Sequence, residues 1–147
     1  MKAADFDYSC AASIPEVCRM LAGANGEARI IAGGQTLVPL LAMRLARPAL
    51  LVDINRIADL RGIEFSNGAV TIKACTTQAD ALASDVIRNH APLLAKALRH
   101  VGHTQTRNRG TVGGSLAHAD PAAELPAVVA ALDGDLVIAS ARGRRVV

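Results

Sequence analysis

Two pairs of adjacent glycines constrain this chain more than any other feature. The first pair lies in "RIIAGGQTLVPLL", residues 29–41, and the second in "GTVGGSLAHADPAAELP", residues 110–126. Adjacent glycines permit positive φ angles and let the backbone approach a ligand closely, because no Cβ is in the way. Successive N–H groups in such a turn can converge on an anion, and a following helix N-terminus favours negative charge. A hydroxyl residue, Thr36 or Ser115, follows each pair. Two such loops would suit the two phosphate groups of a pyrophosphate.

A tight turn without any ligand explains either pair equally well when that pair is considered alone, because glycine pairs are common at turns. Neither stretch has the GxGxxG pattern of dinucleotide-binding proteins or the GKS/T ending of a P-loop. Two similar stretches in one chain, each beside an apolar run, favour the ligand interpretation.

Apolar runs and turn residues predict a small parallel α/β unit in the first 55 residues. A serine cap, a first-turn proline and a capping-box glutamate predict a helix over about 14–21. Short buried strands are predicted at 28–32 and 49–54, with a helix at 36–46 between them. Strand, loop, helix and strand in this order are typical of parallel pairing.

After residue 55 the pattern changes to an α+β one. Two alternating runs joined by Asn67-Gly68 predict a β-hairpin. A helical region is predicted from about 77 to 101, with an interruption near Pro92. Asp120 followed by proline predicts the start of another helix, with Asp120 as its cap.

The end of the chain is expected to form a turn at Asp133-Gly134, a strand, and a further hairpin beginning at Arg142-Gly143. The chain stops within this pattern. A sheet edge left unpaired there would be prone to non-native pairing. We therefore expect a fragment of a longer protein.

Composition narrows the function classes. Hydrophobic residues make up 51% of the chain, which excludes a disordered protein. The only aromatic residues are Phe6, Tyr8 and Phe65, so the core must be aliphatic and base-stacking platforms for nucleic acid are disfavoured. Neither a signal peptide nor an apolar run of membrane-spanning length is evident, and a cytoplasmic protein is expected.

Several polar clusters leave alternatives open. The net charge is +3, and five basic residues near the second glycine pair could face an anionic ligand or form a solvated surface: Arg99, His100, His103, Arg107 and Arg109. The two histidines lack a convincing third metal ligand, and the three cysteines lack metal-type spacing, so no metal site is predicted.

Acidic residues near the second pair are equally ambiguous. His118 and Asp120 could pair as a base and its orienting acid, although a helix cap explains Asp120 more simply. Glu124 could accept a hydrogen bond from a sugar-like hydroxyl, or could be a surface carboxylate near a helix N-terminus. No residue lies in the context of a catalytic nucleophile.

The segments "AGGQTLVPLLAMRLARP" and "QTRNRGTVGGSLAHADPAAELP", with the order of elements between them, resemble the FAD-binding subunit of molybdenum hydroxylases. This is the medium subunit of the carbon monoxide dehydrogenase and xanthine dehydrogenase family. The resemblance covers essentially all 147 residues. Two departures are Thr106, where the family generally has an apolar residue, and a length close to half that of family subunits.

The resemblance implies an α+β fold of the two-subdomain FAD-binding type, also seen in vanillyl-alcohol-oxidase-like (PCMH-type) flavoproteins. A small parallel α/β subdomain, residues 1–55, would precede a larger antiparallel α+β subdomain, residues 56–147, with FAD between them. The second subdomain would be truncated, and the C-terminal domain of the family would be absent.

The resemblance also implies which residues bind the cofactor. The first loop would hold the FAD pyrophosphate through Ala32, Gly33, Gly34, Gln35 and Thr36. The second would lie against the pyrophosphate and ribityl chain through Thr111, Val112, Gly113, Gly114 and Ser115. Glu124, where the family usually has the shorter Asp, would bind ribityl hydroxyls.

Family members act within a complex. A large molybdopterin subunit hydroxylates the substrate, a small subunit with two [2Fe–2S] clusters relays electrons, and the flavin passes them to an acceptor. The resemblance thus implies an oxidoreductase subunit with FAD, no catalytic acid or base and no metal of its own. Two alternatives are a non-catalytic fragment that keeps the fold but binds only partner subunits, and a nucleic-acid or nucleotide-phosphate module using the arginines near residue 107.

Overall fold

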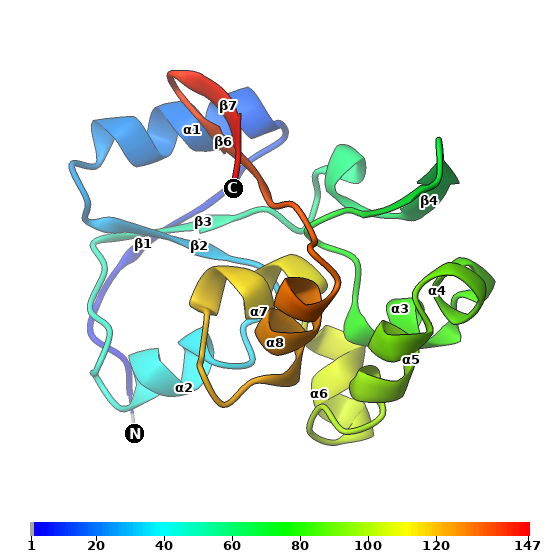
Figure 1. Ribbon diagram of the computed structural model, residues 1–147. Coiled ribbons are helices and arrows are strands. Elements are labelled where there is room, and N and C mark those ends of the chain that lie inside the picture. Colours follow the sequence, from blue (N-terminus) through cyan, green and yellow to red (C-terminus); the bar gives the residue numbers. More distant parts are fainter. Residues whose placement is uncertain (1) are drawn as a thin grey trace. The chain divides into compact units, whose positions relative to one another are not determined.

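The computed structural model describes residues 2–147, which form two compact units (Figure 1). The first unit contains residues 2–58 together with 136–147, and the second contains residues 59–135. The closing residues 136–147 group with the first unit by their contacts, whereas the sequence analysis assigned them to the second part of the chain.

A three-stranded parallel sheet lies at the centre of the first unit (Figure 1). Its strands, in spatial order β1–β3–β2, are β1 (Asp7–Cys10), β2 (Ala28–Ile31) and β3 (Leu50–Asp53). The register places Asp53 opposite both Cys10 and Ile31. The predicted parallel pairing of the second and third strands is confirmed. Strand β1 was not predicted, because the polar stretch "DYSC" lacks an apolar run.

Helix α1 (Ile14–Gly23) begins where the sequence predicts it. The Ser13 hydroxyl accepts a hydrogen bond from the Glu16 backbone N–H at 3.4 Å. The Glu16 carboxylate reaches back and accepts from the Ala12 N–H at 2.8 Å, one residue before the position that a standard capping box uses. Both interactions satisfy donors that the first turn of a helix leaves unpaired.

Helix α2 (Leu37–Ala42) is shorter than the predicted helix over 36–46. The chain turns at Arg44, whose φ of 59° is incompatible with a continuing right-handed helix. Thr36 occupies the N-cap position, but its side chain makes no capping hydrogen bond.

The predicted hairpin near the chain end is confirmed. Strands β6 (Val137–Ser140) and β7 (Gly143–Val146) pair antiparallel, with Gly143 at a φ of 121° beside the turn. This hairpin lies alongside α1 within the first unit (Figure 1).

The second unit begins with the predicted hairpin. A 3₁₀ helix, η1 (Ala58–Leu60), leads to strands β4 (Ile63–Ser66) and β5 (Ala69–Ile72), which pair antiparallel. Asn67 and Gly68 have φ angles of 51° and 78°, the pattern of a type I′ turn.

Six short helices complete the second unit: α3 (Gln78–Ala83), α4 (Asp85–His90), α5 (Pro92–Leu98), α6 (Thr104–Arg109), α7 (Val112–His118) and α8 (Glu124–Ala131). The predicted helical region over 77–101 is therefore broken twice. One break lies near Pro92, as predicted, and the other at Ser84, whose hydroxyl caps α4. Helix α6 lies in a polar stretch without periodicity and was not predicted.

Two local predictions after residue 110 are wrong. Gly113 and Gly114 lie in the first turn of α7, not in an open loop. Asp120 does not cap the last helix, because its carboxylate accepts a hydrogen bond from the Ala122 N–H at 2.9 Å and closes a local turn instead. Helix α8 begins later, at Glu124.

The core of the second unit is aliphatic, as the scarcity of aromatic residues requires. It consists of Ala81, Ile87, Ala91, Leu94, Ala95, Leu98, Val112, Leu125 and Val128. Full burial of each Leu or Ile side chain contributes about 1.5–3 kcal/mol. None of the helices within residues 2–147 has both the length and the apolarity that a membrane crossing requires.

Candidate functional site

The first glycine pair lies in a turn that joins the carboxyl end of β2 to α2. Gly34 has a φ of 71°, a conformation that favours glycine. A Cβ there would also lie 3.0 Å from a Val38 methyl group. Gly33 and Gly34 are half-buried, while Gln35 and Thr36 are exposed. The turn therefore presents backbone and two polar side chains to its surroundings.

The backbone N–H groups of this turn are available to a ligand. Within residues 2–147, no protein atom accepts a hydrogen bond from the N–H of any residue from Gly33 to Leu37. The first helical hydrogen bond runs from the Val38 N–H to the Gly34 carbonyl at 2.9 Å. The Gln35 side chain donates within the turn, to the Gly33 carbonyl at 3.1 Å. A run of consecutive unpaired donors is the arrangement that binds anions.

A polar chain of residues supports this turn from the sheet. Asn55 donates from its side-chain nitrogen to the Ala32 carbonyl at 2.8 Å. One carboxylate oxygen of Asp53 accepts from the Asn55 backbone N–H at 2.7 Å and from its side chain at 2.8 Å. The other carboxylate oxygen accepts a hydrogen bond from the Tyr8 hydroxyl.

This network shifts the ionisation of two of its members. Burial raises the pKa of Asp53, but the hydrogen bonds from Tyr8 and Asn55 and the nearby charge of Arg56 together hold that pKa below its ordinary value of 3.8. The pKa of Tyr8 is raised above 10.0, first because its hydroxyl donates to Asp53 and then because of desolvation and the carboxylate charge. At neutral pH, Asp53 is therefore an anion and Tyr8 a neutral donor.

The second glycine pair has a different environment, in which the backbone donors are already used. Protein atoms accept from four consecutive N–H groups at 3.0–3.1 Å: Val112 to the Thr76 carbonyl, Gly113 to the Ala74 carbonyl, Gly114 to the Thr111 hydroxyl, and Ser115 to the Thr111 carbonyl. The N–H groups of Val112 to Ser115 therefore do not form a run of unpaired donors like that of the first glycine turn. Thr111, only 3% exposed, uses its hydroxyl as a helix cap.

Close packing explains both glycines of the second pair. A Cβ at Gly113 would lie 2.6 Å from the Ala74 Cα, a distance that real Cβ atoms do not reach. A Cβ at Gly114 would lie 2.7 Å from the Thr111 hydroxyl oxygen and would disturb the cap. These glycines let the start of α7 pack against the backbone before α3.

Two polar side chains of the second unit remain near this stretch. Ser115 is half-buried on α7, and Glu124 is half-buried as the first residue of α8. Over the described part of the chain, neither side chain has a hydrogen-bond partner. The carboxylate of Glu124 is favoured there by the helix N-terminus.

The basic cluster divides between structural and exposed residues. The Arg107 guanidinium donates to the carbonyls of Val101 and Gly102 at 2.9 and 3.0 Å and to the Thr104 hydroxyl at 3.3 Å, so it closes the connection between α5 and α6. Arg99 and Arg109 are exposed.

His118 and Asp120 are both exposed, and in residues 2–147 no hydrogen bond joins them. The alternative of a base with an orienting acid therefore receives no support from the structure. The Asp120 carboxylate instead accepts from the backbone of the same turn, at Ala122.

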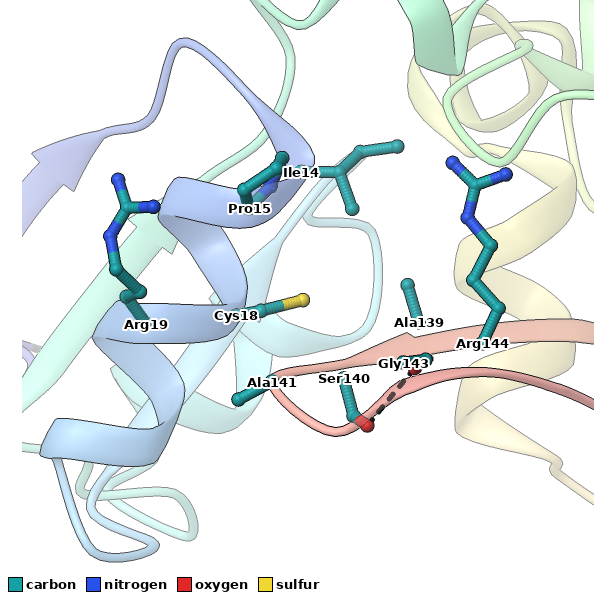
Figure 2. A pocket seen from close by; sticks show the side chains of 9 residues that line it. All are labelled: Ile14, Pro15, Cys18, Arg19, Ala139, Ser140, Ala141, Gly143 and Arg144. Atoms are coloured by element: carbon teal, nitrogen blue, oxygen red, sulfur yellow. Dashed lines mark hydrogen bonds between the residues drawn. The ribbon is translucent and has the colours of Figure 1, made fainter.

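A pocket of about 370 Å³ lies in the first unit between α1 and the β6–β7 hairpin (Figure 2). The Cys18 thiol points into it, with Arg19 and Arg144 at its sides (Figure 2). Cys18 is a free thiol, as is Cys10. The lining includes none of the residues that the sequence analysis assigned to the cofactor.

Tyr8, Asp53 and Asn55, which support the first glycine turn, were not predicted from the sequence. The signal available for two of them was the position of "DIN" directly after a buried strand. Polar residues at the carboxyl ends of parallel strands commonly line the binding edge of an α/β sheet. Tyr8 offered no comparable signal, because its strand was not predicted.

Comparison with known proteins identifies the family. Residues 4–147 match the family described as the FAD binding domain in molybdopterin dehydrogenase. One relative is the 6-hydroxypseudooxynicotine dehydrogenase complex subunit alpha of Paenarthrobacter nicotinovorans, which is 49% identical over 145 residues, covering 99% of this chain and 49% of the relative.

Solved structures agree with this match. A carbon monoxide dehydrogenase from Hydrogenophaga pseudoflava has a TM-score of 0.98 at 38% identity, and quinoline 2-oxidoreductase from Pseudomonas putida 86 has a TM-score of 0.97 at 45% identity. Each match covers 100% of this chain and 51% of the other, so this chain spans about half the length of the proteins it resembles. The predicted mixed helix and strand architecture is confirmed, and the chain belongs to the family of FAD-binding domains in molybdopterin dehydrogenases.

Proposed function

We propose that this chain is the FAD-binding part of the medium subunit of a molybdenum hydroxylase. In this role the flavin would pass electrons from [2Fe–2S] clusters to an acceptor. The observation that carries the proposal is the run of unpaired backbone N–H groups from Gly33 to Leu37, in a chain of an FAD-binding family. A pyrophosphate needs such donors, so the residues present fit the cofactor.

The first glycine turn would hold the pyrophosphate. Its backbone would come close to the pyrophosphate and donate hydrogen bonds from its N–H groups. The residues of this turn are Ala32, Gly33, Gly34, Gln35 and Thr36. The exposed Thr36 hydroxyl, which caps no helix, is available to a phosphate oxygen.

The second stretch would contribute shape more than donors. The backbone N–H groups of this stretch from Val112 onward and the Thr111 hydroxyl already form hydrogen bonds within the second unit. The stretch consists of Thr111, Val112, Gly113, Gly114 and Ser115. The Ser115 hydroxyl and the Glu124 carboxylate remain, and both suit the ribityl hydroxyls of FAD. A carboxylate accepting from a hydroxyl is stronger than a neutral pair.

Bound FAD would supply the redox chemistry, accepting and passing on electrons, and the protein would supply binding and orientation. None of the proposed contacts requires an acid, a base or a metal from this chain. The proposed fold is the two-subdomain PCMH type, with the small parallel subdomain ending near residue 55. The proposed partners are a small [2Fe–2S] subunit and a large molybdopterin subunit in a cytoplasmic complex, in keeping with relatives named as complex subunits or medium chains.

The test is retention of FAD by the purified protein after desalting, followed by its visible absorption spectrum. We expect a flavin spectrum from the wild-type protein and none from Gly33→Val, because the valine side chain would occupy the position of the pyrophosphate. Gly23→Val is the matched control, since a Cβ at Gly23 meets nothing within 4 Å. A folded wild-type protein without flavin, or equal retention by Gly33→Val, would instead support a module that keeps the fold without the cofactor.

A further inference from the structure

We infer that Asn55 is a positioning residue for the phosphate-binding turn. Its side chain, held by Asp53 and through it by Tyr8, fixes the Ala32 carbonyl and thereby aims the Gly33 N–H at the cofactor. This inference rests on the proposed function. It adds to that proposal a group of residues that would not touch FAD and would determine how well the turn receives it.

The peptide group between Ala32 and Gly33 links the Asn55 side chain to the phosphate-binding turn. The Ala32 carbonyl and the Gly33 N–H belong to the same planar, trans peptide, so they point in opposite directions. The Asn55 side chain holds that carbonyl at 2.8 Å, from a position 23 residues along the chain. Fixing the oxygen therefore fixes the direction of the N–H, the first in the run of unpaired donors.

The Asn55 side-chain amide has one orientation only. Its nitrogen carries two hydrogens, and their acceptors are the Ala32 carbonyl and the Asp53 carboxylate, both at 2.8 Å. Rotating the amide by 180° would place its oxygen against these two acceptors. The Asp53 carboxylate also accepts from the Asn55 backbone N–H at 2.7 Å, which fixes the start of the side chain as well.

The hydrogen-bond network that holds Asn55 extends across the sheet. Asp53 ends the central strand β3, and its second carboxylate oxygen accepts from Tyr8 on β1. Ala32 directly follows β2 on the other side of β3. Hydrogen bonds thus link all three strands to the turn, and loss of the Tyr8 hydroxyl should loosen the turn less than loss of the Asn55 side chain.

The experiment compares Asn55→Ala, Tyr8→Phe and the control Asn89→Ala, which changes an exposed residue of α4. FAD is titrated into each purified apoprotein by flavin fluorescence. We expect the dissociation constant for FAD to rise about tenfold in Asn55→Ala, because the hydrogen bond to the Ala32 carbonyl is lost. In Tyr8→Phe we expect a rise of about threefold, because that hydrogen bond is only weakened. The control should equal the wild type. Tyr8→Phe keeps the test decisive if Asn55→Ala does not fold.

A second measurement separates positioning from stability alone. The ³¹P NMR resonances of the bound FAD pyrophosphate are recorded at saturating FAD, beside the melting temperature of each apoprotein. A positioning role shifts these resonances in Asn55→Ala or Tyr8→Phe. Unchanged resonances, with weaker binding that follows only a lower melting temperature, would overturn the inference.

The outcomes also distinguish this inference from the proposed function. Wild-type FAD binding with unaffected dissociation constants in both variants would overturn the inference and leave the proposed function intact. A wild-type protein that binds no FAD, or a Gly33→Val variant that binds it equally well, would overturn both.

Discussion

The Thr111 hydroxyl accepts a hydrogen bond from the Gly114 backbone N–H at 3.1 Å and so caps helix α7. Thr36 holds the same N-cap position before α2, yet its side chain makes no such bond. Two threonines beside two glycine pairs thus have different environments, one buried and engaged, the other exposed. We therefore expect Thr111 to contribute to stability and Thr36 to contribute to cofactor binding.

Thr111→Val should lower the free energy of unfolding by about 1–2 kcal/mol, because it removes a helix cap and leaves the part-buried Gly114 N–H unpaired. Thr36→Val, the matched variant, should change it by less than about 0.5 kcal/mol and should weaken FAD binding instead. Urea unfolding of the apoprotein and FAD titration measure the two effects. Equal losses of stability in both variants would contradict the assignment.

Gly113→Ala should lower the free energy of unfolding by about 1–3 kcal/mol even without FAD, because the new methyl group would overlap the backbone at Ala74. Gly23→Ala should have no such cost, since the space around Gly23 is open. Thermal unfolding of the two apoproteins makes the comparison. A Gly113→Ala variant as stable as wild type would mean that the close packing at α7 is not required.

Tyr8 should titrate above pH 10.0, because its hydroxyl donates to the Asp53 carboxylate. The group therefore contributes stability below that pH, and the contribution is lost as the pH rises through the higher folded pKa. The chain has one tyrosine and no tryptophan, so tyrosinate absorbance of the FAD-free 147-residue chain reports Tyr8 alone. Asp53→Asn should return the midpoint toward the ordinary value, and Asp59→Asn should not.

Asp53 should contribute to stability with the opposite dependence on pH. Its folded pKa lies below 3.8, so its contribution is present above that pH and is lost as the pH falls through the lower folded value. The stability difference between wild type and Asp53→Asn should therefore be largest at neutral pH and shrink below pH 3.8. Urea midpoints across an acid series measure it. A difference that stays constant with pH would mean that the Asp53 charge has no role.

Glu124→Ala should weaken FAD binding by about 1–2 kcal/mol if the carboxylate accepts from a ribityl hydroxyl. Glu27→Ala, which removes an exposed carboxylate of the first unit, is the control. Fluorescence titration with FAD reports both. An unchanged affinity would assign Glu124 to the protein surface.

Much of the local structure could be predicted because it depends on neighbouring residues. Ser13 and Glu16 set the start of α1, and Asn67-Gly68 sets a hairpin, since their φ angles and caps are local properties. Helix α6 and strand β1 could not be predicted in this way. Their sequences, "TQTRNR" and "DYSC", carry no periodicity, and α6 packs on α3 while β1 pairs with β3.

The sequence by itself determined the order of the helices and strands other than β1 and α6, the positions of the two glycine pairs and, through its motifs, the family resemblance. Only the tertiary structure decided what each pair can do. The Ala74 carbonyl accepts from the Gly113 N–H and the Thr111 hydroxyl accepts from the Gly114 N–H, whereas the N–H groups from Gly33 to Leu37 meet no acceptor within residues 2–147. The physical reason is that a backbone N–H has the same chemistry in both places, and its availability depends on which distant carbonyl the fold brings beside it.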